Sequence, residues 1–266
     1  MTYLVIPDCH GRKFWRQAIA NNIDKVDKVI FLGDYLDPYQ NEIEENPELM
    51  ECEYFGDSKN LLKMLEDIIL LKKNEPDKYI LLTGNHSDSY IWSKFRAATR
   101  TDYKSWEKYH KFFSQNLEYF NLVWIENDTI FSHAGISEGW KNEVVNRLEF
   151  PEDDYSVTIM NIASILKNIS LSKFDNNYIK VISDISHRRG GDMPYGSCEW
   201  ADIMEHIDHY QSEVQEKIVP LGDNEIYQVF GHTHLKKPLI TDKWACLDCR
   251  QGFIFDTITH ECKSCL

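Results

Sequence analysis

Short stretches rich in β-branched and aromatic residues alternate along this chain with longer stretches whose apolar residues recur every three or four positions. The first pattern is typical of β-strands and the second of amphipathic helices. Strands are expected at Tyr3–Ile6, Lys28–Leu32, Tyr79–Leu82, Leu122–Ile125, Thr129–Ser132, Tyr227–Phe230, Leu239–Ile240, Ala245–Leu247 and Phe253–Phe255. Helices are expected at Lys13–Asn21, Ser58–Lys73, Lys104–Asn116, Glu138–Arg147 and Ser156–Lys167. This alternation predicts an α/β layered domain.

No linker rich in Pro, Gly or Ser divides the sequence, and no internal repeat is visible. We therefore expect a single domain over residues 1–266, with insertions near 40–56 and 87–120. The segment Gln40–Glu53 is the one stretch whose composition indicates a solvated rather than a packed conformation.

Composition narrows the function classes. Of the 266 residues, 13% are aromatic, so a packed core rather than disorder is expected. Lys and Arg number 29 against 43 Asp and Glu, and the formal charge of -14 repels phosphate backbones. Extended nucleic-acid binding is therefore excluded.

No apolar run approaches the ~20 residues that span a membrane, and no basic signal-peptide region precedes the first strand, so we expect no membrane association and a cytoplasmic protein.

The seven cysteines are an odd number in a chain too long to need disulfide staples. Two Cys-x-x-Cys pairs, Cys246 with Cys249 and Cys262 with Cys265, are separated by twelve residues, a spacing that suits a zinc ribbon. The alternative is that both pairs lie in strands of a C-terminal hairpin, with Ile254–Asp256 as the intervening strand. We favour the hairpin, because free cysteine is a common small core residue.

Polar clusters follow five of the expected strands at their C-terminal ends. In chain order they contain Asp8 and His10, then Asp34, then Asn85 and His86, then His133, and finally His232 and His234. Open α/β sheets bind ligands at this edge. Five of the chain's ten histidines fall in these clusters, and their joint placement indicates one shared site.

Carboxylate and imidazole ligands suit Mn, Fe and Zn. Two divalent cations need a bridging group, and one aspartate carboxylate can supply it. Two carboxylates, Asp8 and Asp34, leave two such cations with about two positive charges in excess. A phosphate dianion would be attracted there despite the acidic chain, and a bridging hydroxide could attack its phosphorus in line.

Taken together, the motifs Asp-x-His, Gly-Asp, Gly-Asn-His, His-Ala-Gly and Gly-His-Thr-His resemble those of the calcineurin-like metallophosphoesterase superfamily, over residues 3 to about 255. The resemblance implies a four-layer αββα sandwich of two mixed β-sheets flanked by helices. It also implies two metal sites, one formed by Asp8, His10, Asp34 and His234 and the other by Asp34, Asn85, His133 and His232. Asp34 would bridge the two metal ions, which we expect to be manganese, with iron, zinc or nickel as alternatives.

The run Gly33–Asp37 looks like the Ser/Thr protein phosphatase and dinucleoside tetraphosphatase branch of that superfamily. In this branch the second aspartate orients the histidine of Gly-Asn-His, which implies a pair between Asp37 and His86. A further run beginning at Arg189 is similar to one that supplies a phosphate-binding arginine. These three residues are the expected catalytic set.

One departure from that branch concerns specificity. Pro38 and Tyr39 stand where the branch has Arg-Gly, so one phosphate-clamping arginine is missing, and Arg96 or Arg100 could replace it. The expected function is hydrolysis of a phosphomonoester or phosphoanhydride carried by a small molecule or a phosphoprotein. The alternatives are a phosphodiesterase acting on cyclic nucleotides or nucleic-acid ends, and a catalytically silent, metal-stabilised binding scaffold.

Overall fold

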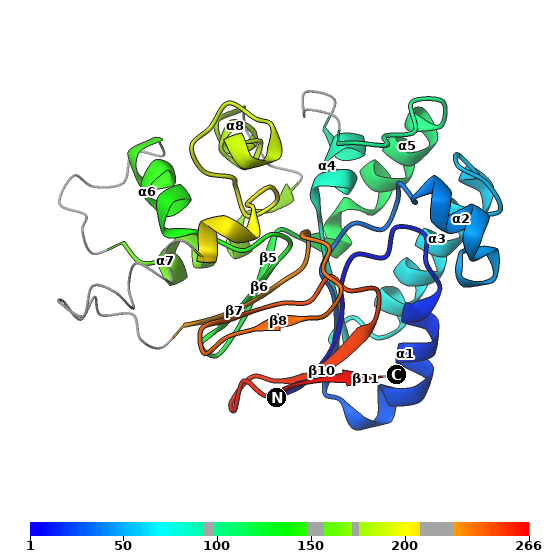
Figure 1. The fold of residues 1–266 in the computed structure, drawn as a ribbon, viewed down its shortest axis with the longest axis horizontal. Helices are drawn as coiled ribbons and strands as arrows, with labels where there is room; N and C mark the ends of the chain where they lie inside the picture. The colour runs from blue at the N-terminus through cyan, green and yellow to red at the C-terminus, as the bar shows by residue number, and fades with distance from the viewer. Residues whose placement is uncertain (93–97, 148–156, 172–175, 208–225, 266) are drawn as a thin grey trace.

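Two β-sheets face each other at the centre of the molecule, with helices on both outer sides (Figure 1). The computed structural model describes residues 1–92, 98–147, 157–171, 176–207 and 226–265. The six-stranded sheet has the order β11-β10-β1-β2-β3-β4 and the five-stranded sheet the order β5-β6-β7-β9-β8. Each sheet contains parallel and antiparallel pairs. The expected four-layer αββα sandwich of two mixed sheets is confirmed.

The nine expected strands are all present, each to within one residue at either end. The strands are β1 (Thr2–Ile6), β2 (Lys28–Phe31), β3 (Tyr79–Leu82), β4 (Phe120–Asn121), β5 (Val123–Glu126), β6 (Thr129–Ser132), β7 (Tyr227–Phe230), β8 (Leu239–Ile240), β9 (Trp244–Cys246), β10 (Gly252–Asp256) and β11 (Cys262–Cys265). The helices are α1 (Phe14–Asn22), α2 (Gln40–Glu45), α3 (Ser58–Asn74), α4 (Asn85–Ile91), α5 (Trp106–Asn116), α6 (Glu138–Arg147), α7 (Ile159–Asn168) and α8 (Asn176–Ile182). The five expected helices correspond to α1, α3, α5, α6 and α7.

The central strands are buried on both faces, which explains their unbroken apolar sequences. In β1, Tyr3 and Val5 point into the layer between the sheets, whereas Leu4 and Ile6 belong to the larger core under the helices. On the outer side of that core, α3 presents Leu61, Met64, Leu65, Ile68 and Ile69. None of the described helices is both long and apolar enough to cross a membrane.

The segment Gln40–Glu53 is more packed than its composition indicates. Ile43, Met50 and Cys52 are buried, and α2 buries the carboxylate of Glu42 against Arg12. The Arg12 guanidinium binds Glu42 through two hydrogen bonds of 2.6 and 3.0 Å. The expectation of a solvated segment therefore holds for most of its residues, which are exposed, and fails at these buried positions, because a buried ion pair and three scattered apolar residues leave no periodic pattern to detect.

The expected C-terminal hairpin is present as β10 and β11, but it holds only the second cysteine pair. Cys246 ends β9, which pairs with β7 in the five-stranded sheet, and Cys249 lies in the loop that follows. The placement of all four cysteines in one hairpin is therefore wrong. All seven cysteines are free.

Candidate metal centre

The two sheets bring their polar strand ends to one place. Strands β1, β2 and β3 are parallel neighbours in one sheet, and β6 and β7 are parallel neighbours in the other. The loops after them are joined by backbone hydrogen bonds, from His10 N–H to Asp34 O (2.8 Å) and from Gly231 N–H to His133 O (2.8 Å). The five predicted clusters therefore converge on one edge of the sandwich.

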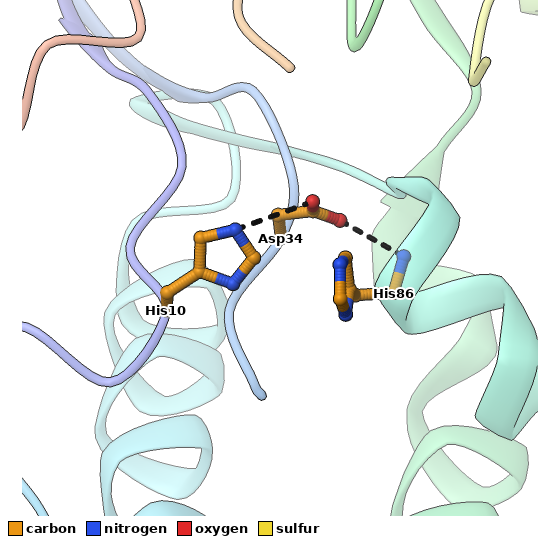
Figure 2. Close-up of side chains that lie close together, drawn as sticks. All are labelled: His10, Asp34 and His86. Carbon is orange, nitrogen blue, oxygen red and sulfur yellow. Dashed lines mark hydrogen bonds and ion pairs between the residues drawn. The ribbon is translucent and has the colours of Figure 1, made fainter. Parts of the chain in front are cut away.

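One group of potential metal ligands contains His10, Asp34 and His86 (Figure 2). His10 Nε2 lies 3.6 Å from Asp34 Oδ2, and the His86 backbone N–H donates to Asp34 Oδ1 at 3.0 Å. His10 Nδ1 donates to the carbonyl of Leu36 (2.7 Å), which leaves the Nε2 lone pair directed at the group. One side-chain ligand atom from each residue lies within 4.8 Å of the others.

A second group contains Asp34, His133 and His232, so Asp34 belongs to both. His133 Nε2 lies 3.4 Å from Asp34 Oδ2, 3.0 Å from Asn85 Oδ1 and 3.1 Å from His232 Nδ1. Its Nδ1 donates to the carbonyl of Leu32 (2.9 Å). This fixed ring orientation is typical of histidines that bind metals.

The remaining two predicted ligands are placed differently. Asp8 is buried at the centre, where its carboxylate accepts the backbone N–H of His232 at 3.1 Å. Burial and the charge of Asp248 raise the pKa of Asp8 well above its usual range. His234 lies outside both groups, with its side chain 40% exposed and its Nδ1 3.9 Å from Asp248 Oδ1.

The backbone at this edge is strained. His10, Asp34 and His232 have positive φ angles of 43°, 47° and 62°, a conformation that non-glycine residues rarely adopt. Two glycines allow the close approach of the loops. A Cβ at Gly84 would lie 2.5 Å from Asp34 Oδ1, and one at Gly231 would lie 2.2 Å from Asp8 Oδ1.

The predicted pair between His86 and Asp37 is present. His86 Nδ1 and Asp37 Oδ2 are 2.6 Å apart, and both side chains are buried. Tyr90, which the sequence analysis did not single out, donates its hydroxyl to Asp37 Oδ1 at 2.5 Å and accepts the backbone N–H of Asp102 at 2.8 Å. The carboxylate of Asp37 is therefore held from both sides.

One arginine lies near each of the two groups of potential ligands. Arg189 binds Thr233 Oγ1 and lies 2.9 Å from Asp202 Oδ2. Arg100 donates to the carbonyl of Asp37 (3.1 Å) and stacks 3.7 Å above the ring of Tyr39. Arg96, the other candidate clamp, lies outside the described residues.

The sequence analysis missed two buried carboxylates beside the centre, Asp88 and Glu199. Burial and the charge of Glu199 raise the pKa of Asp88, and burial raises the pKa of Glu199 to about 8. The one signal in the sequence is that Glu199 stands as an isolated charge between Cys198 and Trp200.

The donor set fits divalent transition metals. Burial lowers the pKa of His10 and of His232, so both are neutral imidazoles, the form that binds metals. Burial opposes ionisation of Asp34, but His133 and His86 outweigh it and hold the pKa of Asp34 well below its usual range. Within the described structure, His232 Nε2 is buried without a hydrogen-bond partner. A metal ion would satisfy such a nitrogen.

The fold and this cluster define an α/β protein with a buried aspartate–histidine centre at the edge of two sheets. The model of the calcineurin-like phosphoesterase family matches residues 1–236, and the chain belongs to this family. The family is metal-dependent, in agreement with the donor set described above.

Comparison with solved structures gives distant likenesses. A Ser/Thr protein phosphatase from Saccharomyces cerevisiae, described as similar to human phosphatase PP5, aligns with 14% identity and a TM-score of 0.48, over 93% of this chain and 66% of its own. A diadenosine tetraphosphatase, so described only provisionally, aligns with 11% identity and a TM-score of 0.39 over 99% and 92%. A metallophosphoesterase from Sphaerobacter thermophilus aligns with 17% identity and a TM-score of 0.27 over 56% of each chain. No curated relative matches the chain significantly.

Proposed function

We propose that this chain is a dinuclear-metal phosphoesterase that hydrolyses a phosphomonoester or a phosphoanhydride. The observation that carries the proposal is that Asp34 belongs to both groups of potential ligands, as a bridging carboxylate must. When bound, two divalent cations supply Lewis acidity and generate a nucleophile from water at neutral pH.

We assign the ligands by their positions. Asp34 would bridge two sites, with His10 on one side and Asn85, His133 and His232 on the other. Asp8 is assigned to the side of His10 through the resemblance to the family pattern. His234 is assigned to the first site through the resemblance of Gly-His-Thr-His to the family pattern. Its binding there requires its exposed ring to move from Asp248 toward His10.

His86 is assigned a different role from its neighbours because its partner differs. His10 and His133 bind backbone carbonyls through Nδ1, whereas His86 Nδ1 faces the carboxylate of Asp37. A carboxylate partner stabilises an imidazolium, so we propose that His86 protonates the leaving oxygen while Asp37 orients it.

The substrate is proposed to be a small phosphorylated molecule or a phosphoprotein. Arg100 and Arg189 place positive charge near the two groups of potential ligands in a chain whose formal charge is -14. Arg189 can hold phosphoryl oxygens as a planar fork. Arg100 stacks on Tyr39, whose ring meets that of His10 edge-on at 5.5 Å, so it takes the place of the missing clamp. Specificity is assigned to the insertions near 40–56 and 87–120.

The test combines metal analysis with turnover. After dialysis against Mn²⁺, we expect about two metal ions per chain and hydrolysis of nitrophenyl phosphate. Asp34→Asn should lose both ions, because the bridge carries a charge that both cations use, whereas Asp128→Asn, a surface change, should keep both. One ion or none in the wild type would refute the dinuclear proposal. A panel of phosphomonoesters, diesters, phosphopeptides and dinucleoside polyphosphates then identifies the substrate class.

A further inference from the structure

Asp88 and Glu199 are completely buried, yet they are poorly satisfied. Both are 0% exposed. Within the described part of the chain, neither carboxylate oxygen of Asp88 has a hydrogen-bond partner, and Glu199 Oε2 has none. Glu199 Oε1 accepts one hydrogen bond, from Thr83 Oγ1 at 3.0 Å. Two buried carboxylates in this state are costly unless a positive charge compensates them.

Both residues belong to segments that contact the loops of the metal centre. Thr83, which binds Glu199, immediately precedes the Gly-Asn-His motif. On the other side, the carbonyl of Cys198 accepts the backbone N–H of Ala134 (2.7 Å), which fixes Glu199 beside the loop that carries His133.

Asp88 reaches the same place from α4. Its backbone N–H donates to the carbonyl of Gly84 (2.9 Å), one helical turn away. The α-carbon of Gly84 packs against Asp34 and His133, since a Cβ there would lie 3.0 Å from His133 Cε1.

The nearby arginines have other partners. Arg12 binds Glu42 through two hydrogen bonds, and Arg189 pairs with Asp202. On the proposed function, two divalent cations bring four positive charges, of which Asp8 and Asp34 neutralise two. The two charges left over equal the two that Asp88 and Glu199 would carry when ionised.

We propose that Asp88 and Glu199 are the buried counter-charge of the metal centre, positioned behind His133 to neutralise the excess charge of the cations without binding them. This inference rests on the proposed dinuclear function. It assigns the two residues to metal affinity rather than to contact with the substrate.

The test measures metal affinity and metal-free stability together, in the full chain. The Mn²⁺ titration is monitored through the unfolding temperature. Asp88→Asn and Glu199→Gln should each shift its midpoint to a roughly 10–100-fold higher Mn²⁺ concentration, the range known for residues behind metal ligands. In the metal-free protein at neutral pH the same variants should unfold at nearly the wild-type temperature, because burial raises the pKa of both carboxyls and leaves no buried charge to remove. A shifted midpoint together with an unchanged metal-free stability distinguishes a counter-charge from a merely structural residue.

Asp57→Asn is the matched control, because Asp57 is buried but belongs to neither group of potential ligands. Its carboxylate caps α3 by accepting the backbone N–H of Asn60, and it also accepts the backbone N–H of Glu53. The substitution should lower the unfolding temperature with and without metal and leave the midpoint unchanged. An unchanged midpoint in both Asp88→Asn and Glu199→Gln would overturn the inference. So would elemental analysis showing three cations in the wild type and two in the variants, because the carboxylates would then be ligands. A wild type without metal would refute the proposed function instead.

Discussion

Replacing Asp37 by asparagine tests the proposed acid catalysis, because it removes a charge and keeps the shape of the side chain. Asp37 accepts hydrogen bonds from Tyr90 (2.5 Å) and Arg100 (3.1 Å, at its carbonyl) and faces His86 Nδ1 at 2.6 Å. The charged contact with His86 is the one lost. A hydrogen bond to a charged group contributes about 1.5–3 kcal/mol, which corresponds to roughly 10–150-fold in rate.

The expected loss depends on the leaving group. An alkoxide leaves poorly unless it is protonated, so Asp37→Asn should lower kcat/KM for an alkyl phosphate by roughly 10–150-fold. Nitrophenolate leaves unaided, so nitrophenyl phosphate should be affected much less. His86→Ala should show the same ordering with a larger loss on the alkyl phosphate, about 10²–10⁴-fold.

The assay is steady-state kinetics on both substrates, with metal content measured on the same samples. Tyr90→Phe is the control, because it removes a neutral hydrogen bond to Asp37 and leaves the charge. It should change the ratio between the two substrates less than Asp37→Asn does. Equal losses on both substrates, or release of a metal ion from His86→Ala, would refute the acid role and make His86 a ligand, as its place beside His10 and Asp34 would allow.

Three further predictions address other parts of the molecule. Arg189→Lys should lower kcat/KM by an amount equivalent to about 1–3 kcal/mol of transition-state stabilisation while the metal content stays constant, since lysine cannot form the planar fork. Wild-type kinetics would contradict this role. Joint replacement of Cys262 and Cys265 by serine should leave the metal stoichiometry unchanged, and loss of one zinc per chain by elemental analysis would establish the ribbon instead. Glu42→Gln should lower the free energy of unfolding by about 3 kcal/mol at neutral pH, because it breaks the buried pair with Arg12. Burial alone would raise the pKa of Glu42, but Arg12 outweighs it and holds the pKa below its usual 4.5. The difference in unfolding free energy between this variant and the wild type, measured in denaturant titrations, should therefore vanish as the pH falls through the lowered pKa.

The sequence predicted the elements whose pattern comes from burial. Strand β1 is apolar throughout because Tyr3 and Val5 face one core while Leu4 and Ile6 face the other. Helix α4 has no such pattern. Its first residues are polar groups buried at the centre, so hydrophobic periodicity could not reveal a helix there.

The sequence predicted the site residues that follow strands, but not those whose positions depend on contacts between distant segments. His133 directly follows β6 and His232 lies two residues after β7, and their proximity follows from the parallel pairing of these strands. Glu199 follows no strand and belongs to no motif, since its position depends on contacts with Thr83 and with the loop after β6. Such contacts between distant segments leave no local trace in a sequence.

The division of the centre between two sheets has a consequence for how the molecule assembles. His10 and Asp34 follow strands of the six-stranded sheet, whereas His133 and His232 follow strands of the other. The hydrogen bond from His232 to Asp8 joins positions 224 residues apart, so this contact forms only when segments near the two ends of the sequence have come together. A bound ion would act as a cross-link between the two halves of the sandwich. A chain in which only one sheet has formed therefore lacks the complete centre, and the proposed hydrolysis would require both sheets to be folded.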